Sequence, residues 1–373
     1  MQKFLKIVAT NLLIMLVLLT IADPFFKTKN QETTKRCVMI KELPPNIDFE
    51  KTPPDRYMVK TQNLEQQPYR VRTDKNGFIT SKKPTQNTDN VDIMFFGGST
   101  TECMYVEEDK RFPFLTGELL SEILGREISV INAGVGGGHS FHSTINLFAK
   151  GLPLQPKTVV WMHNINDLVS LSKTGTYHSG PDTRTLVHTH TRTGKFDGKV
   201  SRRFKAFAQS GRDLLIPNIY RRTRQAVQKN PADINLDEWE SYRKAKSYNY
   251  EIIEKQFEQS LLSFINVARS HDINVVLMTQ FNRLNPEDDF IRKTYGTNPN
   301  NQAINYDNFC KYYKNLNIKI KEIATQENVF LIDLVNEIPQ DSLYIYDPVH
   351  LNTQGSELAA KIISEHLFKL NIK

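Results

Sequence analysis

Apolar and polar residues alternate along much of this chain in blocks that predict strands followed by helices. Short apolar runs bounded by turn residues are typical of buried strands, and they lie at residues 91–96, 128–133, 158–162, 274–279 and 329–334. Elsewhere apolar residues recur every three to four positions, the spacing of a helix that buries one face. The predicted helices span residues 112–124, 139–150, about 240–270, 306–326 and 353–370.

Strands that alternate with helices predict a parallel sheet, because a parallel connection needs a long return segment. The expected fold class is therefore α/β: three α/β/α layers around a five-stranded parallel sheet of the flavodoxin-like type. In such sheets the functional site lies at the carboxyl ends of the strands. The polar residues that follow each apolar run are the first candidates for chemistry.

The first 26 residues differ from the rest of the chain. Residues 1–6 contain two lysines, and residues 7–22 carry no charge. This pattern predicts a signal anchor or a signal peptide over residues 1–26, with a helix inside the globular core as the third reading. Sixteen residues give a helix of roughly 24 Å, so an uncleaved anchor needs Phe25, Phe26 and a snorkelling Lys6 to complete the span. The basic flank predicts a body outside the cytoplasm.

Two further segments interrupt the regular pattern. Residues 27–90 are polar and rich in Pro, Thr, Asn and Lys, and they predict a stalk or linker with a few short strands, for example around residues 70–80. Residues 168–239 form a predicted insertion with weak periodicity, and residues 173–229 hold thirteen Lys and Arg against three Asp. A connection this long is functional or disordered. The alternatives are a solvated, mobile insertion and a lid or partner-binding surface.

Composition narrows the class of partner. The net charge is +7, but Lys and Arg are spread along the chain, which gives nucleic-acid binding little support. The charge is compatible with an anionic lipid or an acidic glycan. Three widely spaced cysteines, Cys37, Cys103 and Cys310, predict neither a disulfide framework nor a zinc site, and they leave open a single bridge.

The first candidate for chemistry is Ser99, in the motif FFGGSTTE. Gly97 and Gly98 let the chain turn sharply at the end of the first predicted strand of the alternating pattern. The Ser99 hydroxyl is then expected at the strand's carboxyl end, beside free backbone N–H groups. Alone, this motif is also an ordinary turn.

Two motifs after the next strands offer hydrogen-bond donors. NAGVGGGHS contains a glycine loop whose backbone can approach a ligand closely. It is not a dinucleotide fingerprint, because His139 stands where the last glycine of G-x-G-x-x-G belongs. In MHNINDL, the amide of Asn166 is a candidate donor to a developing oxyanion. A strand-to-helix turn and an Asx turn are the alternative readings of the two motifs.

The last motif, YDPVHLNTQGSELAAKII, places Asp347 and His350 on a loop before the final predicted helix. A carboxylate beside a histidine orients the imidazole and stabilises the imidazolium that forms when the histidine takes a proton. An Asp-x-x-His pair occurs often by chance, so its weight comes from its combination with the other motifs.

The order of these motifs, each after a strand, resembles that of the SGNH hydrolases, also called the GDSL esterase family. The resemblance covers about residues 91–168 and 245–370. It implies a catalytic triad of Ser99, Asp347 and His350. It also implies an oxyanion hole formed by Ser99, Gly137 and Asn166.

Gly137 is the family-matching glycine because it lies five positions after Asn132, with Gly134 as the alternative. The sequence departs from the family pattern at two places. Gly98 replaces the aspartate of Gly-Asp-Ser, and Asn164 replaces the glycine of Gly-x-Asn-Asp. Neither change removes a reacting group. Together they suggest a membrane-associated subgroup with a narrow substrate range.

The resemblance implies a serine esterase that cleaves acyl esters, O-acetyl esters among them, of a glycan or lipid at the cell surface or in the periplasm. Such a mechanism needs no cofactor and no metal. The pairs His188/His190 and His139/His142 lack the carboxylate or cysteine partners of a metal site. The alternatives are an O-acyltransferase, or its accessory protein, in polysaccharide acylation, and a catalytically inactive binding module.

Overall fold

The computed structural model describes residues 10, 11, 14, 35–81, 91–178, 185–190, 249–296 and 305–370. The chain divides into two compact units, of which the first comprises residues 1–37 and 189–222 and the second residues 38–188 and 223–373. A small two-stranded sheet joins β1 (Lys35–Val38) to β8 (Val187–His190). The main sheet and all the candidate site residues belong to the second unit.

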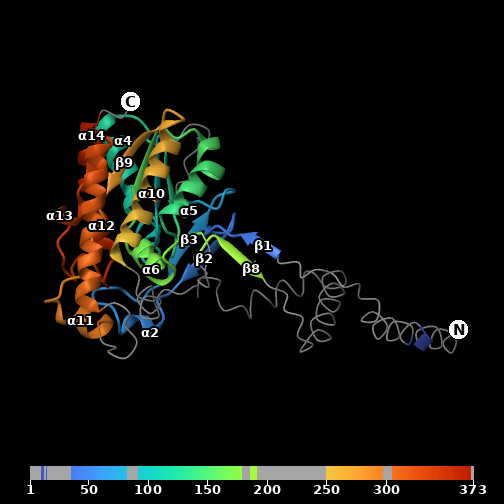
Figure 1. The fold of residues 1–373 in the computed structure, drawn as a ribbon. Coiled ribbons are helices and arrows are strands. Elements are labelled where there is room, and N and C mark those ends of the chain that lie inside the picture. Colours follow the sequence, from blue (N-terminus) through green and yellow to red (C-terminus); the bar gives the residue numbers. More distant parts are fainter. Residues whose placement is uncertain are drawn as a thin grey trace. The chain divides into compact units, whose positions relative to one another are not determined.

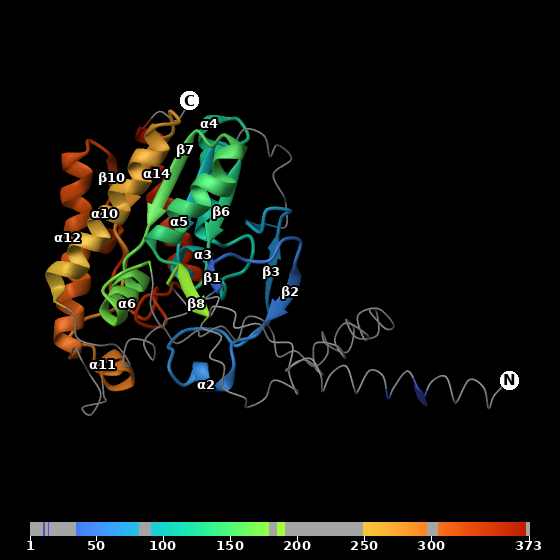
Figure 2. The ribbon, with the colours of Figure 1, turned by 45° about the vertical axis from the view of Figure 1, so that its right-hand side comes forward.

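The main sheet has eight strands in the order β10-β9-β7-β5-β6-β4-β3-β2. Figure 1 shows the fold as a ribbon, with helices such as α10 (Tyr250–Arg269) and α12 (Tyr306–Gln326) beside the strands. From β10 to β6 neighbouring strands run parallel, in the order of a flavodoxin-like sheet. The other three strands pair antiparallel beyond β6 (Figure 2). The strands span Asp48–Lys51 (β2), Tyr69–Thr73 (β3), Ile79–Thr80 (β4), Ile93–Gly97 (β5), Val130–Gly134 (β6), Thr158–Met162 (β7), Asn274–Met278 (β9) and Phe330–Ile332 (β10).

The predicted α/β fold class is confirmed. The sheet, however, has eight strands and not the predicted five. The three extra strands come from the segment predicted as a stalk, and β4 joins the parallel part where Ile79 pairs with Asn132. In β3, the side chains of Tyr69, Val71 and Thr73 are buried, and Arg70 between them is exposed. Such a strand buries one face. Most of residues 35–81 is therefore part of the folded body.

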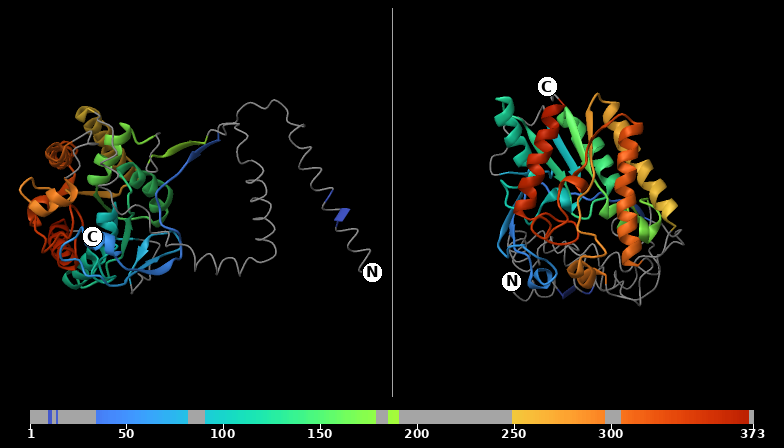
Figure 3. Two further views of the ribbon diagram at one scale, coloured as in Figure 1. Left: turned by 90° about the horizontal axis from the view of Figure 1, so that it is seen from below. Right: turned by 90° about the vertical axis from the view of Figure 1, so that its left-hand side faces the viewer.

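Helices cover both faces of the sheet (Figure 3). Core side chains on one face pack with those of α5, α6, α10 and α12, and those on the other face pack with α4 and α14. The helices span Asp55–Met58 (α2), Ser99–Glu102 (α3), Phe112–Leu124 (α4), Ser140–Asn146 (α5), Ile165–Thr174 (α6), Tyr250–Arg269 (α10), Asp289–Tyr295 (α11), Tyr306–Gln326 (α12), Leu334–Glu337 (α13) and Thr353–Lys369 (α14). The predicted three-layer arrangement is thus present.

β5 shows why the parallel strands were recognisable. Ile93 and Phe95 enter the core on one face of the sheet, and Met94 and Phe96 enter the core on the other. A strand buried on both faces is apolar throughout. Its last residue, Gly97, lies two positions before Ser99.

Residues around the C-terminal helix fix the loop that carries Asp347 and His350. The side chain of Asn352 accepts a hydrogen bond from the Gly355 amide and so begins α14 as its N-cap. Its amide nitrogen donates to the Leu343 carbonyl oxygen at 2.8 Å. Arg283, which is buried, donates to the Ile345 carbonyl oxygen at 3.0 Å. The loop is therefore held at both ends.

Several predictions concern residues outside the described ranges. Within those ranges, no helix has the length and apolar character needed to cross a bilayer. Of the predicted anchor at residues 1–26, the structure describes Thr10, Asn11 and Ile14 alone. The predicted insertion at 168–239 begins inside α6, and its residues 179–184 and 191–239 lie outside the described part.

Cys103 and Cys310 are free and buried, so neither forms the single disulfide that the sequence left open.

Candidate active site

Ser99 stands at the start of α3, where β5 ends. A Cβ atom on Gly98 would collide with the Asn166 amide nitrogen and lie 3.1 Å from the Gly138 carbonyl oxygen. The absence of a side chain at position 98 therefore lets Asn166 and the glycine loop pack directly against the residue before Ser99. Glycine therefore fits position 98 without displacing either group.

The structure brings Ser99, His350 and Asp347 together as a hydrogen-bonded chain. His350 Nε2 lies 2.9 Å from Ser99 Oγ, and His350 Nδ1 lies 2.7 Å from Asp347 Oδ2. The other carboxylate oxygen, Oδ1, accepts from the backbone N–H groups of Val349 and His350 at 2.9 and 2.8 Å. Three residues from opposite ends of the domain thus have the geometry in which a histidine can take a serine proton.

Asp347 is suited to hold a negative charge. Its burial alone would raise its pKa, but the charge and hydrogen bond of His350 and two backbone N–H groups outweigh burial and lower the pKa below its ordinary value. A carboxylate that stays ionised fixes the His350 ring orientation and stabilises an imidazolium. The ring of Tyr346 stacks on that of His350, with centroids 5.7 Å apart and planes at 11°.

Tyr57 is a site residue that the sequence did not indicate. Its hydroxyl donates to Asp347 Oδ2 at 2.8 Å, and it is buried. Tyr57 comes from α2 in the predicted stalk, 290 positions before Asp347. Only the pairing of β2, β3 and β4 with the sheet brings this segment near the triad, and a lone tyrosine carries no local signal of such a contact.

We expect Tyr57→Phe to weaken the triad without dismantling it. With one donor fewer, the Asp347 carboxylate protonates more readily, so its pKa rises and activity on the acid side is lost at higher pH. Two backbone donors remain, so kcat at the plateau should fall by less than about tenfold. The pH profile of kcat measures this. Tyr69→Phe is the matched control, because its hydroxyl bonds the Glu65 carbonyl oxygen; an equal shift in both variants would contradict the assignment.

The glycine loop and Asn166 lie together, as the oxyanion-hole prediction requires. Asn166 Nδ2 donates to the Gly138 carbonyl oxygen at 2.8 Å, which uses one of its two N–H groups. Gly137 has a positive φ of 70°, a conformation that favours glycine. Asn132 ties the loop to α3, because its Oδ1 accepts from Gly134 N at 2.9 Å and its Nδ2 donates to the Thr101 carbonyl oxygen at 3.0 Å.

Asn166→Ala is expected to slow the acyl-transfer step. Loss of one oxyanion donor raises the barrier by about 2.7–4 kcal/mol, roughly 100- to 1000-fold in kcat. KM should change little, because the donor acts on charge that develops in the transition state. Steady-state kinetics on an activated ester test this against Asn308→Ala, an exposed asparagine on α12. A fall below threefold would leave Asn166 as a structural residue of α6.

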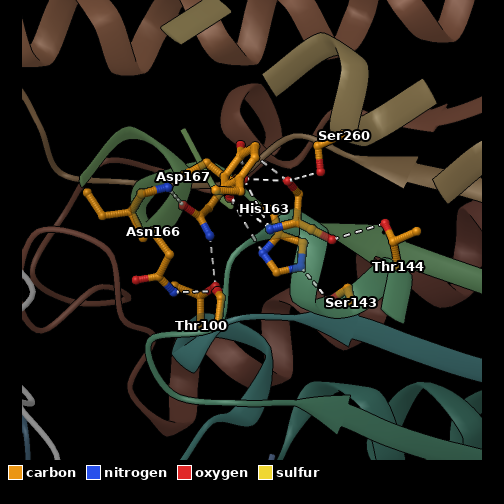
Figure 4. A network of polar contacts seen from close by, with 12 residues as sticks. Thr100, Ser143, Thr144, His163, Asn166, Asp167 and Ser260 are labelled. Atoms are coloured by element: carbon orange, nitrogen blue, oxygen red, sulfur yellow. Dashed lines mark hydrogen bonds and ion pairs between the residues drawn. The ribbon is translucent and has the colours of Figure 1, made fainter. Parts of the chain in front are cut away.

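Behind the glycine loop lies a buried polar network centred on Asp167 (Figure 4). Asp167 Oδ1 accepts from the backbone N–H of Ser140 at 3.0 Å, from its hydroxyl at 2.5 Å and from the Tyr177 hydroxyl at 2.6 Å. The Ser140 hydroxyl also lies 2.6 Å from that of Ser260 on α10. These bonds join α5, which follows the glycine loop, to α6, which carries Asn166.

The same network contains a second serine, histidine and aspartate that do not form a catalytic triad. Ser143 Oγ lies 2.7 Å from His163 Nε2, but His163 Nδ1 is 3.8 Å from Asp167 Oδ2. Burial lowers the pKa of His163 to about 3, so it is neutral and the 3.8 Å contact is no ion pair. All three side chains are buried. His163 is thus a neutral hydrogen-bonding residue.

Ionisation of the buried Asp167 should lower the free energy of unfolding as pH rises. Burial raises its pKa to about 6, above the ordinary value of about 3.9 in an unfolded chain. The folded state then binds the proton more tightly, and this contribution to stability is complete below pH ~4 and lost as pH rises through about 6. The free energy of unfolding of the native protein minus that of Asp167→Asn should fall between these values and then level off. Denaturant titrations at several pH values measure it; a constant or rising difference would contradict the shift.

Gln280, directly after β9, links the nucleophile segment to α6. Its amide nitrogen donates to Thr100 Oγ1 at 2.8 Å, and its oxygen accepts from the backbone N–H of Ile165 at 3.0 Å. The Tyr313 hydroxyl donates to the same oxygen at 2.8 Å. The neighbours of Ser99 and Asn166 are therefore held by one side chain, which no sequence motif indicated.

Within the described ranges, no three His, Cys, Asp or Glu side chains gather as metal ligands would.

Comparisons with known proteins yield structural matches of low sequence identity. A GDSL-like lipase from Bacteroides thetaiotaomicron is 13% identical, with 77% of this chain and 91% of that chain covered and a TM-score of 0.39. The lipase/acylhydrolase from Enterococcus faecalis is 15% identical, with 75% and 96% covered and a TM-score of 0.40. A catalytic mutant of an acetylxylan esterase from Geobacillus stearothermophilus is 15% identical, with 78% and 95% covered and a TM-score of 0.40. No family model matches the sequence, and no curated protein matches it.

Proposed function

We propose that this chain is a serine ester hydrolase of the SGNH, or GDSL, family, with Ser99, Asp347 and His350 as its triad. The observation that carries the proposal is the continuous hydrogen-bonded chain from Ser99 Oγ through both nitrogens of His350 to Asp347 Oδ2, at 2.9 and 2.7 Å. The glycine loop and the Asn166 amide stand beside the residue before Ser99, where an oxyanion hole belongs. These parts together support acyl transfer.

In the first half of the reaction, Ser99 Oγ attacks the ester carbonyl carbon while its proton passes to His350 Nε2. The carbonyl π electrons move to oxygen, and the resulting oxyanion is held by the N–H groups of Ser99 and Gly137 and by the Asn166 amide. The C–O bond to the alcohol then breaks, and the departing oxygen takes the proton from His350. The products are an acyl-Ser99 ester and the free alcohol.

In the second half, water replaces the alcohol. His350 Nε2 takes a proton from this water as its oxygen attacks the acyl carbon. The tetrahedral intermediate collapses, the bond to Ser99 Oγ breaks, and Ser99 recovers the proton from His350. Asp347 stays ionised throughout and keeps Nδ1 of His350 as the donor nitrogen. An acceptor hydroxyl in place of water would make the same site an acyltransferase.

We also propose a cellular location for the protein and a class of substrate. Residues 7–22, uncharged and preceded by two lysines, support an N-terminal membrane anchor or signal with the body outside the cytoplasm. An ester of a glycan or lipid is the substrate expected there. In intact cells, externally added protease should digest residues 30–373; protection of this body would overturn the orientation.

Turnover of p-nitrophenyl esters, followed by acetylated glycans, tests the activity. Product analysis with and without an added polysaccharide acceptor separates hydrolysis from transfer, because transfer yields an acylated acceptor in place of free acid. We expect free acid in both cases. Acylated acceptor as the main product would favour the transferase, and no turnover of any ester by folded protein would overturn the proposed function.

A further inference from the structure

A small cavity lies beside the Ser99 hydroxyl. Its volume is about 20 Å³, and its wall includes Ser99 and His350 together with the side chains of Tyr57, Met104, Tyr105 and Tyr346. A cavity needs roughly 10–15 Å³, in this measure, to hold one water molecule. The space beside the nucleophile therefore matches one methyl-sized group.

The walls of this cavity are held by contacts to one another and to the triad. The Tyr57 ring lies 5.7 Å from that of Tyr105 and 6.3 Å, edge on, from that of Tyr346. Tyr57 also donates to Asp347, and Tyr346 stacks on His350. Widening the cavity by moving either ring would disturb a catalytic contact. Neither ring can therefore move to admit a longer group without loss of activity.

The acidic residue of the wall, Glu102, directs its carboxylate toward the glycine loop. Glu102 is buried, and its Oε2 lies 2.9 Å from the point where a Cβ on Gly136 would stand. Its carboxylate therefore sits under the glycine loop. Apart from Ser99, His350 and Thr100, the other residues of the wall are three tyrosines, Cys103, Met104 and the buried Leu351, and these are largely apolar surfaces that suit an apolar group.

An ester bound at Ser99 has two substituents on its carbonyl carbon, and this cavity, which Ser99 and His350 line, is the space into which one of them can extend. The alcohol portion leaves the site during each turnover and, in a glycan or lipid, is far larger than 20 Å³. It therefore extends toward solvent, on the open side of Ser99 and His350, both of which are partly exposed. The acyl group is therefore the substituent that extends into the cavity.

We propose that the acyl group this site accepts is acetyl, so that its substrates are O-acetyl esters. The inference rests on the proposed esterase function and adds the length of the acyl chain. Acetyl places one methyl group in the cavity. Each added methylene must displace wall atoms, and one methylene changes kcat/KM by roughly 10- to 200-fold in sites of this kind.

The test is kcat/KM of the full chain on p-nitrophenyl acetate, propionate, butyrate and octanoate. We expect at least a tenfold fall from acetate to propionate and a further fall at butyrate. Ser99-dependent hydrolysis of butyrate or octanoate as fast as that of acetate would overturn the acetyl assignment and leave the esterase intact. No hydrolysis of any ester, and no labelling of Ser99 by a fluorophosphonate, would overturn the esterase and this inference together.

Met104→Ala tests the cavity itself. Met104 is half-buried and lines the cavity, so its truncation should lower the acetate-to-butyrate ratio of kcat/KM at least tenfold. Met58→Ala is the matched control, because Met58 packs against the same tyrosine cluster but does not line the cavity, and its ratio should stay at the native value. An unchanged ratio in folded Met104→Ala protein, or an equal change in both variants, would overturn the assignment.

Discussion

Ser99→Ala should abolish ester hydrolysis while leaving the fold intact. The hydroxyl is the atom that forms the acyl-enzyme, and no neighbouring group replaces it in the proposed mechanism. Loss of a serine nucleophile costs on the order of 10⁶-fold in kcat. Ser99 is partly exposed at the start of α3, so removing one oxygen creates no core cavity. Initial rates on an activated ester, with thermal unfolding as the check on folding, measure both effects.

Ser270→Ala is the matched control, since Ser270 is exposed at the end of α10 and has no part in the site. Its activity should equal that of the native protein. A well-folded Ser99→Ala variant that retains native turnover would refute the triad.

His350→Ala should be as damaging as Ser99→Ala, and Asp347→Asn less so. His350 moves the proton in both halves of the reaction, whereas Asp347 orients the ring and stabilises its positive charge. Loss of the aspartate costs about 10⁴-fold in serine hydrolases of this design. Because the residues act as a unit, the Ser99→Ala/His350→Ala double variant should fall no further than either single variant. Rates near pH 7 on one ester compare the four proteins.

Two residues outside the triad serve as controls for these changes. His366→Ala removes a histidine that pairs with Glu337, and Asp341→Asn changes a carboxylate in the same loop as Asp347. Both variants should retain native turnover. Additive losses in the double variant, or a greater loss from Asp347→Asn than from His350→Ala, would be incompatible with the proposed roles.

The parallel half of the sheet could be predicted because its strands are buried on both faces. In β7 all five residues are buried, which leaves an uninterrupted apolar run in the sequence. The edge strands gave a weaker signal. β4 has two residues, Ile79 and Thr80, and its partner in β6 lies 53 positions away at Asn132. A pattern this short does not encode a distant partner, so the segment was interpreted as a stalk.

The candidate triad could be predicted because Ser99 belongs to a motif that follows a strand, and because Asp347 and His350 form a motif of their own before the final helix. Ser99 follows β5, and the loop with Asp347 and His350 lies between α13 and α14. Tyr57 and Gln280 could not be found this way. Tyr57 bonds Asp347, 290 positions away, and Gln280 bonds Thr100, 180 positions away, and no spacing rule links such pairs. Burial of Asp167 is likewise a property of the packed helices around it.

Covalent labelling with a fluorophosphonate tests the central claim most directly, because only an activated serine reacts at a useful rate. The native protein, incubated with the probe and digested, should carry one adduct, on the peptide that contains Ser99. The adduct should be missing in Ser99→Ala and form far more slowly in His350→Ala, which lacks the base that lies 2.9 Å from the Ser99 hydroxyl. An adduct on another serine, or none on the folded native protein, would contradict the account.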